Sequence, residues 1–135
     1  MQLHRYLAWC YDAMSSRRDA ELESLSVDEV YPGASAAIKG RLRFWDNSLF
    51  EFVELLEMRS NLLRRVEYAY HYQDSHGNLV FRYDDSPHHP EIETHPHHKH
   101  VGHGETESIE ATVAPHLSRV LQEIERHLYP ETYRS

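Results

Sequence analysis

Hydrophobic residues recur with a helical period at both ends of the chain. Near the start, residues 2–22 have apolar side chains spaced three and four apart, namely Leu3, Leu7, Cys10, Tyr11 and Met14. Near the end, residues 110–129 have a second apolar stripe, made of Val113, Leu117, Val120, Leu121, Ile124 and Leu128. Pro115 suits the first turn of that second segment, and Pro130 stops it. The pattern predicts a helix over residues 2–22 and another over about residues 110–129.

Between these ends the apolar residues alternate with polar ones, as in strands of a sheet with one buried face. The alternation is clearest over residues 34–45 and 62–73, less regular over 49–58, and short over 24–31 and 79–83. Turn-forming residues separate these runs. We therefore predict an α+β fold: an antiparallel meander of four to five strands over about residues 24–84, with N-terminal and C-terminal helices packed on one face. Residues 1–135 are predicted to form a single domain.

The same alternation assigns side chains to the two faces of the predicted sheet. Tyr68, Tyr70 and Tyr72 fall on the core face. The opposite face is predicted to carry five basic or titratable side chains, Arg41, Arg43, Arg65, His71 and Arg82. That face is therefore a candidate surface for an anionic ligand.

Charge is spread unevenly, and the net value of −8 argues against a protein that coats nucleic acid. Residues 39–83 hold seven basic and six acidic side chains, whereas residues 84–135 hold four and ten. The mean hydropathy is −0.71, and no apolar run approaches the ~20 residues of a membrane span, so no membrane association is expected. The start of the chain lacks the form of a signal peptide, and the single Cys10 rules out an internal disulfide. A cytoplasmic location is expected.

Histidine is concentrated in one segment outside these regular patterns. Seven of the twelve histidines fall between His88 and His103. Three prolines interrupt the segment, so we predict a histidine-rich loop over residues 86–104, followed by an acidic loop to residue 110. Because imidazole can transfer protons or bind a metal ion near neutral pH, this segment is the candidate chemical site.

Four strings of residues in and before this loop form a specific pattern: residues 70–74 (YHYQD), 77–84 (GNLVFRYD), 87–90 (PHHP) and 96–100 (PHHKH). They resemble the TumE family of small prokaryotic toxins. The leading helix, the turn at residues 32–33, the strand around residues 40–43 and the trailing helix also resemble the family layout, and the likeness spans roughly residues 25 to 128. Asp85 and His95 depart from the family, which often has Asn and an aromatic residue there. The resemblance implies the toxin of a type II toxin–antitoxin pair, with a cognate antitoxin protein as partner.

Clustered imidazoles in a toxin first suggest a ribonuclease that needs no metal or other cofactor. A neutral imidazole would take the proton of a ribose 2′-OH, and a protonated one would supply a proton to the leaving oxygen. The candidate acid and base groups are His71, His88, His89, His97, His98 and His100. Arg82 would stabilise the transition state, and Asp84 would orient one imidazole. The predicted substrate-binding residues are Arg41, Arg43, Arg65 and Lys99.

Two alternatives stay open from the residues alone. On extended backbone His98 and His100 project to one side, as do His95 and His97, so either pair could chelate zinc or another divalent metal. His88 or His89 could complete three ligands, and the set His89, His98 and His100 is the one we name. Hydroxide bound to that metal could then cleave phosphodiesters. The other alternative is a non-enzymatic protein whose histidine-rich loop, pinned by Asp84 and Asp85, engages a protein partner. RNA and a second copy of the chain are further candidate partners.

Overall fold

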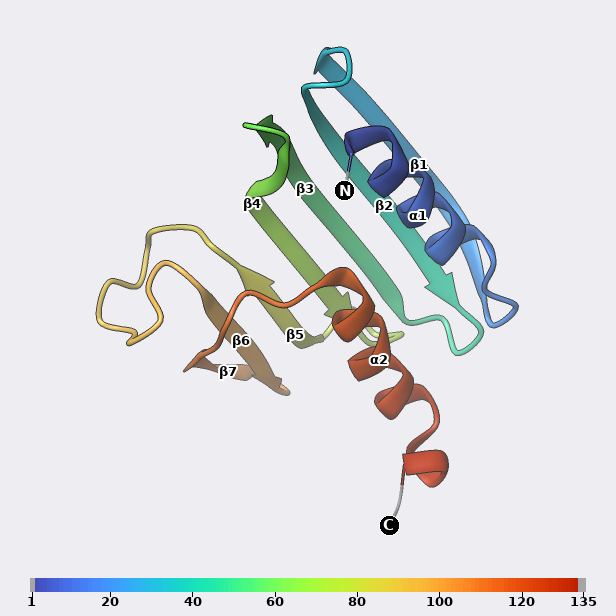
Figure 1. The fold of residues 1–135 in the computed structure, drawn as a ribbon. Coiled ribbons are helices and arrows are strands. Elements are labelled where there is room, and N and C mark those ends of the chain that lie inside the picture. Colours follow the sequence, from blue (N-terminus) through green and yellow to red (C-terminus); the bar gives the residue numbers. More distant parts are fainter. Residues whose placement is uncertain (1, 134–135) are drawn as a thin grey trace.

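Seven strands in one sheet and two helices make up the part of the chain that the computed structural model describes, residues 2–133 (Figure 1). The strands β1 to β7 span Ala20–Tyr31, Ser35–Phe44, Leu49–Arg59, Leu62–Gln73, Leu79–Asp84, His98–His103 and Thr106–Ala111. The helices are α1 (Leu3–Ser15) and α2 (Leu117–Leu128), and a 3-10 turn, η1 (Pro130–Tyr133), follows α2. Each strand pairs antiparallel with the next one in the chain, so the predicted α+β meander is confirmed.

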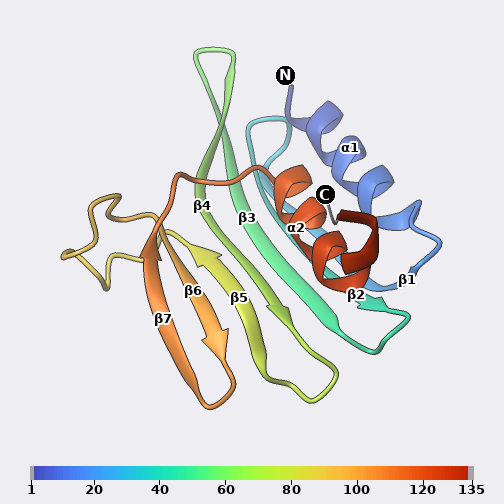
Figure 2. The same ribbon diagram turned by 90° about the horizontal axis from the view of Figure 1, so that it is seen from below.

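Both helices lie on the same face of the sheet, as the two perpendicular views show (Figures 1 and 2). We call this side the helix face and the opposite side the open face. The segment between β5 and β6, residues 85–97, projects beyond the end of the sheet that lies away from α1 (Figure 2). The open face and this segment together frame the candidate site.

The prediction of four to five strands undercounts the sheet, because β6 and β7 lie where loops were expected. The sequence of β6, HKHVGH, has Val101 as its one large apolar residue, so it shows no alternation of the usual kind. Backbone pairing with β5 and β7 holds β6 in place instead.

Both predicted helices are longer than the observed ones. The prediction of a helix over residues 2–22 is wrong beyond Ser15, because residues from Ala20 onward pair with β2 as strand β1. The second helix starts at Leu117 rather than near residue 110, and His116 is its N-cap. Val113, predicted on its buried stripe, precedes the helix and is 79% exposed. The rest of that stripe, Leu117, Val120, Leu121, Ile124 and Leu128, is buried as predicted.

The core lies between the two helices and the helix face of the sheet. Leu3, Tyr6, Cys10 and Met14 of α1 are buried against the sheet, together with the stripe of α2. On the strands the alternation places Ile38, Leu42, Phe50, Phe52 and Tyr70 in this core. Burial raises the pKa of the Cys10 thiol to about 12, which suits a packing role.

A bulge in the pairing of β3 with β4 reverses one assignment made from the sequence. The register shifts between Leu55 and Leu56, where Val66 is the additional residue of β4. Arg65 therefore lies on the helix face and not, as predicted, on the open face with Arg41 and His71. Its Nη1 donates to the Tyr70 hydroxyl and to the carbonyl oxygen of Pro115, both at 2.5 Å.

Candidate metal centre

Strand pairing places two histidines beside a carboxylate on the open face. Phe81 and Tyr83 of β5 are buried under α2, so the alternating Arg82 and Asp84 lie on the open face. Arg82 is opposite His100 and Asp84 is opposite His98 in the β5–β6 pairing. The rings of His98 and His100 therefore share this face, and their centroids are 4.9 Å apart.

A third imidazole comes from the segment that connects β5 to β6. The ring of His89 lies 5.0 Å from that of His98 and 5.7 Å from that of His100, measured between centroids. Each of the three side chains offers a ring nitrogen, and these nitrogens all lie within 4.8 Å of one another. The structure thus brings together the three residues of the alternative metal set, His89, His98 and His100.

Each of these imidazoles has an acceptor beside its Nδ1 atom. The carbonyl oxygen of Pro96 lies 2.9 Å from Nδ1 of His98. A Glu107 oxygen lies 3.1 Å from Nδ1 of His100, and a Glu91 oxygen lies 3.1 Å from Nδ1 of His89. Acceptors of this kind hold the proton on Nδ1 and leave the Nε2 lone pair free, which is the usual outer-shell arrangement of a histidine that binds a metal.

The Nε2 atom of His98 is the most informative single atom of the cluster. It is buried and has no hydrogen-bond partner within the described residues. The nearest carboxylate oxygen, Oδ1 of Asp84, is 3.0 Å away, but the contact lacks the geometry of a hydrogen bond. Buried polar atoms normally have a hydrogen-bond partner or a bound ion. The Nε2 atom of His98 is therefore expected to bind a proton or a metal ion.

Asp84 supplies a negative charge at the centre of the cluster. Its Oδ1 accepts from the backbone N–H and the hydroxyl of Ser86 at 3.0 and 2.8 Å, and its Oδ2 accepts from Nε of Arg82 at 3.0 Å. Oδ2 also lies 3.8 Å from Nε2 of His100. Burial alone would raise the pKa of this carboxyl, but the hydrogen bonds from Ser86 and Arg82 hold it below the usual value. Asp84 is therefore ionised at neutral pH.

Three other predicted site residues lie away from this cluster. His97 stacks on Tyr68, and its Nδ1 lies 2.9 Å from the tyrosine hydroxyl. His88 is not one of the three clustered imidazoles, and it lines the far end of a cavity that begins at Arg82 and Asp84. Lys99 alternates with His98 and His100 and so lies on the helix face, where its Nζ donates to Glu123 at 2.7 Å. Lys99, predicted to bind substrate, therefore lies on the opposite face of the sheet from the histidine cluster.

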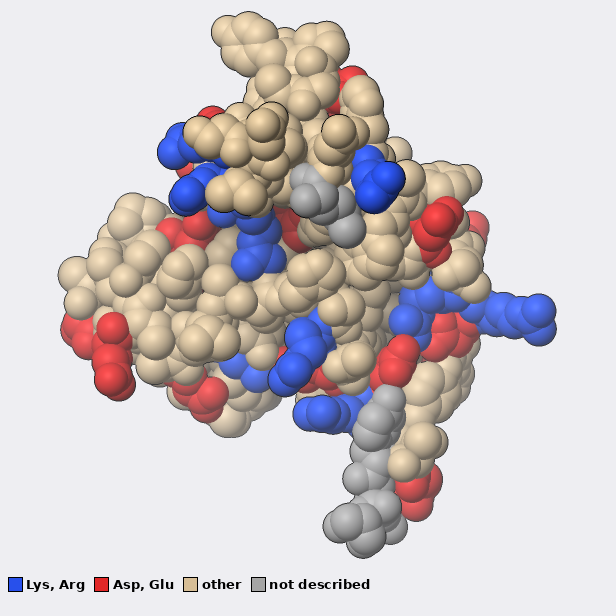
Figure 3. All heavy atoms as spheres, in the orientation of Figure 1, with Lys and Arg blue, Asp and Glu red and all other residues tan. Residues whose placement is uncertain are grey.

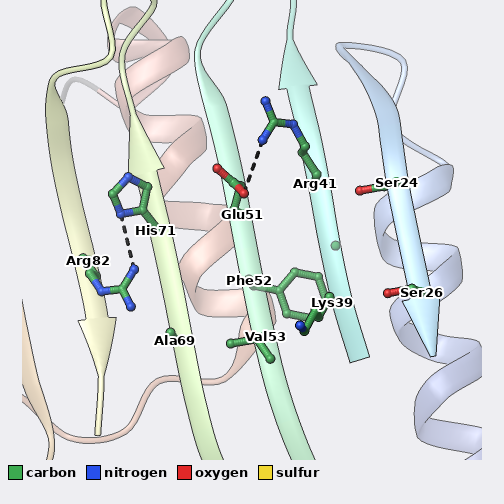
Figure 4. A pocket seen from close by; sticks show the side chains of 11 residues that line it. Ser24, Ser26, Lys39, Arg41, Glu51, Phe52, Val53, Ala69, His71 and Arg82 are labelled. Carbon is green, nitrogen blue, oxygen red and sulfur yellow. Dashed lines mark hydrogen bonds and ion pairs between the residues drawn. The ribbon is translucent and has the colours of Figure 1, made fainter. Parts of the chain in front are cut away.

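The open face next to the cluster is hollowed into a cavity of about 560 Å³ (Figure 4). His71 and Arg82 lie side by side at one edge of it, on the paired strands β4 and β5, with 3.5 Å between Nδ1 and Nη1. Arg41 lies on this face as predicted and forms ion pairs with Glu23 at 2.7 Å and with Glu51 at 3.3 Å. A second cavity, of about 880 Å³, continues from Arg82 past Asp84 to His88.

Two residues of this surface, Lys39 and Glu107, were not predicted as site residues, although the alternation over residues 34–45 places Lys39 on the basic face with Arg41 and Arg43. Lys39 lines both cavities, and among the described residues it forms no ion pair. Its position two residues before Arg41 was the available signal. Arg43 lies on the same face but is paired with Glu23 at 3.3 Å. Glu107 was missed because its approach to His100 depends on the β6–β7 hairpin, which the sequence did not reveal.

Comparison with known proteins gives one match. The family model of Toxin TumE matches residues 14–128. No curated protein and no solved structure matches the chain significantly. Within residues 2–133 neither helix has the length and apolar character needed to cross a membrane.

Proposed function

Because the chain belongs to the TumE toxin family, we propose that it is a toxin that cleaves RNA with a divalent metal ion held by His89, His98 and His100. The observation that carries the proposal is the convergence of three imidazoles, each with an Nδ1 acceptor, around the unpartnered Nε2 of His98. Membership of a toxin family also implies an antitoxin partner.

The ligand set favours zinc among the common metal ions. Three neutral imidazole nitrogens are typical of catalytic zinc sites, which keep the fourth position for water. The second oxygen of Asp84, Oδ2, accepts one hydrogen bond from Arg82 and has a further lone pair. When a metal ion is bound, this lone pair would be available to accept a hydrogen bond from its water.

The reaction follows from these assignments. A bound metal ion lowers the pKa of its water to about 7, so hydroxide is present at neutral pH. A metal ion held by His89, His98 and His100 would thus supply hydroxide for attack on phosphorus; the bond to the ribose oxygen would break, and solvent water would give that oxygen its proton. Arg82 lies between Asp84 and His71, where its guanidinium can stabilise the negative charge on the transferred phosphoryl group.

The metal-dependent form is preferred to cleavage by imidazoles alone. Acid–base cleavage needs one imidazole to donate a proton toward the substrate while another accepts one. Here Nδ1 of His89, His98 and His100 lies beside an acceptor in the protein, so the three Nε2 atoms are the ring nitrogens left to bind a metal ion. A metal ion satisfies the lone pairs of all three at once.

Substrate approach also depends on the metal ion, because the net charge of the chain is −8. Arg41 and Arg43 are paired with glutamates, so they contribute little to attraction of a phosphate. Arg82 and Lys39 line the hollow, and a divalent cation at the adjacent histidine cluster would add to their positive charge. RNA contact is therefore expected near the metal ion rather than along the whole open face.

The test is cleavage of a defined RNA oligonucleotide by the purified full-length chain. We expect EDTA to abolish cleavage, Zn²⁺ or Mn²⁺ to restore it, and His98→Ala to lower the rate by about 100-fold or more. His103→Ala is the matched control. His103 lies on the same strand and is exposed, so this substitution should leave the cleavage rate within about twofold of the wild-type rate.

Two outcomes would contradict this proposal. Cleavage that persists in EDTA but is lost in His98→Ala would favour the metal-free acid–base mechanism. A folded, metal-loaded protein without any cleavage would favour a binding protein instead.

A further inference from the structure

One end of the helix face is left uncovered by α1 and α2, over the β3–β4 hairpin (Figure 1). A cavity of about 540 Å³ lies there, between α1, the start of β4 and the segment that leads into α2. Its walls are apolar and come from Leu56, Leu62, Leu63 and Ala114. We call this cavity the hairpin pocket; it is on the opposite side of the sheet from the histidine cluster.

Arg65 places a cation in the hairpin pocket. The β-bulge turns this side chain onto the helix face, where its guanidinium lies 4.4 Å from the centre of the Tyr68 ring. Nη1 is engaged with Tyr70 and Pro115, whereas Nε and Nη2 donate no hydrogen bond within the described residues. Since a guanidinium presents its donors as a fork that matches a carboxylate, Arg65 is suited to bind one.

The nearby buried glutamate does not satisfy these donors. An oxygen of Glu54 lies 4.0 Å from Nη1 of Arg65, too far for a hydrogen bond. Its two oxygens instead accept from the hydroxyls of Tyr6, at 2.6 Å, and of Tyr70. Glu54 therefore neutralises part of the charge and leaves the donor edge of Arg65 open.

His116 adds a second donor at the same pocket. The backbone N–H of Ser118 donates to its Nδ1 at 3.1 Å, because His116 caps α2. With Nδ1 acting as an acceptor, the proton of the neutral ring is on Nε2. Trp9 packs 5.0 Å from this ring and fixes its position at the pocket.

The rim of the pocket is both apolar and basic. Leu62 is 59% exposed and Val113 is 79% exposed. Lys and Arg side chains are visible around this end of the molecule in Figure 3. Arg5 of α1 lines a neighbouring cavity with Met58 and forms no ion pair among residues 2–133. Arg64 alternates with Leu63 and Arg65 and so lies on the open face, where it does not contribute to the rim. In a chain of net charge −8, this is a local basic and apolar surface.

We propose that the hairpin pocket binds an acidic, leucine-rich segment of a partner protein. One carboxylate of the segment would accept from the free edge of Arg65 and from Nε2 of His116, and an adjacent apolar side chain would pack on Leu56, Leu62 and Leu63. Charge complementarity selects an acidic partner, and the exposed apolar rim requires that the same segment be amphipathic. The proposal does not depend on RNA cleavage, since the pocket and the histidine cluster lie on opposite faces of the sheet.

The test measures binding of a fluorescein-labelled peptide, acetyl-(Glu-Leu-Leu-Glu)₃-amide, by fluorescence anisotropy. We expect saturable binding that weakens with added salt, and a Kd about 10-fold weaker for the matched peptide with Gln in place of Glu. Leu62→Glu, at an exposed position, should also weaken binding about 10-fold. Val27→Glu is the control. It adds the same negative charge at an exposed position of β1 and should bind the peptide with wild-type affinity.

Arg65→Gln tests the carboxylate contact itself, with folding checked by circular dichroism because Arg65 also holds Pro115. His98→Ala should bind the peptide with unchanged affinity, which separates this site from the histidine cluster. Equal binding of the Glu and Gln peptides would overturn the proposal. Wild-type affinity in Leu62→Glu, or no peptide binding by the folded wild type, would overturn it as well.

Discussion

At the scale of single residues, the candidate metal centre depends on which nitrogen of each imidazole holds the proton. His89, His98 and His100 each have a different Nδ1 acceptor, a carboxylate in two cases and a backbone carbonyl in the third. These acceptors fix the ring orientation as well as the tautomer. The same logic applied to His116 gives the opposite tautomer, because there a backbone N–H donates to Nδ1.

Metal affinity should fall steeply as the pH is lowered from 7 to 5. The pKa of Asp84 is held below its usual value, so the stabilisation from its carboxylate is complete above about pH 3.9 and is lost only as the pH falls through the folded value. The carboxylate therefore does not account for a loss of metal in this range, whereas protons compete with a metal ion for imidazole nitrogens in general.

We expect the Co²⁺ affinity, followed by visible absorbance, to fall by about 100-fold or more over this range. Asp84→Asn serves as the control. This variant should bind Co²⁺ more weakly than the wild type at pH 7, and its affinity should fall with pH as the wild-type affinity does. A wild-type affinity that stays constant to pH 5 and drops near pH 4 would point to carboxylate ligands.

At the scale of elements, the pairing of β5 with β6 brings the site together. It sets Asp84 opposite His98 and Arg82 opposite His100. Gly102 allows this pairing, because a Cβ atom at that position would lie 1.7 Å from the carbonyl oxygen of Leu79. That oxygen belongs to the backbone, so β6 would have to move to make room.

Gly102→Ala should therefore damage both the fold and the site. We expect a loss of about 1–3 kcal/mol in the free energy of unfolding, measured in urea, and metal affinity at least about 10-fold weaker. Val101→Ala is the matched control on the same strand, and its metal affinity should stay within about twofold of the wild type. Unchanged metal binding in Gly102→Ala would show that the β5–β6 pairing does not position the ligands.

The elements also show what the sequence could predict. Five strands and both helices were found because their apolar residues keep a regular period, and the set His89, His98 and His100 was identified because alternate residues of a strand share a face. β6 and β7 were missed because backbone pairing rather than an apolar pattern holds them. Arg65 was misplaced because a single bulge residue, Val66, reverses the alternation, and a bulge has no signature in one sequence.

At the scale of the whole molecule, the sheet separates two surfaces of different chemistry. The open face has the histidine cluster beside Asp84 and Arg82, where a metal ion and a phosphate are expected to meet. The helix face has the core and, at one end, the basic and apolar hairpin pocket. A toxin with this arrangement could bind a partner on one side while the other side remains accessible to substrate.

The most direct test of the central claim is the metal content of the purified chain, without a histidine tag, by inductively coupled plasma mass spectrometry. We expect about one zinc ion or other divalent transition-metal ion per chain in the wild type and close to none in His89→Ala/His98→Ala. The control His95→Ala/His103→Ala removes two histidines of the same segment that lie outside the cluster, and it should retain the wild-type content. Equal metal content in the two double variants, or no bound metal in a folded wild type after zinc loading and desalting, would contradict the assignment of a metal centre.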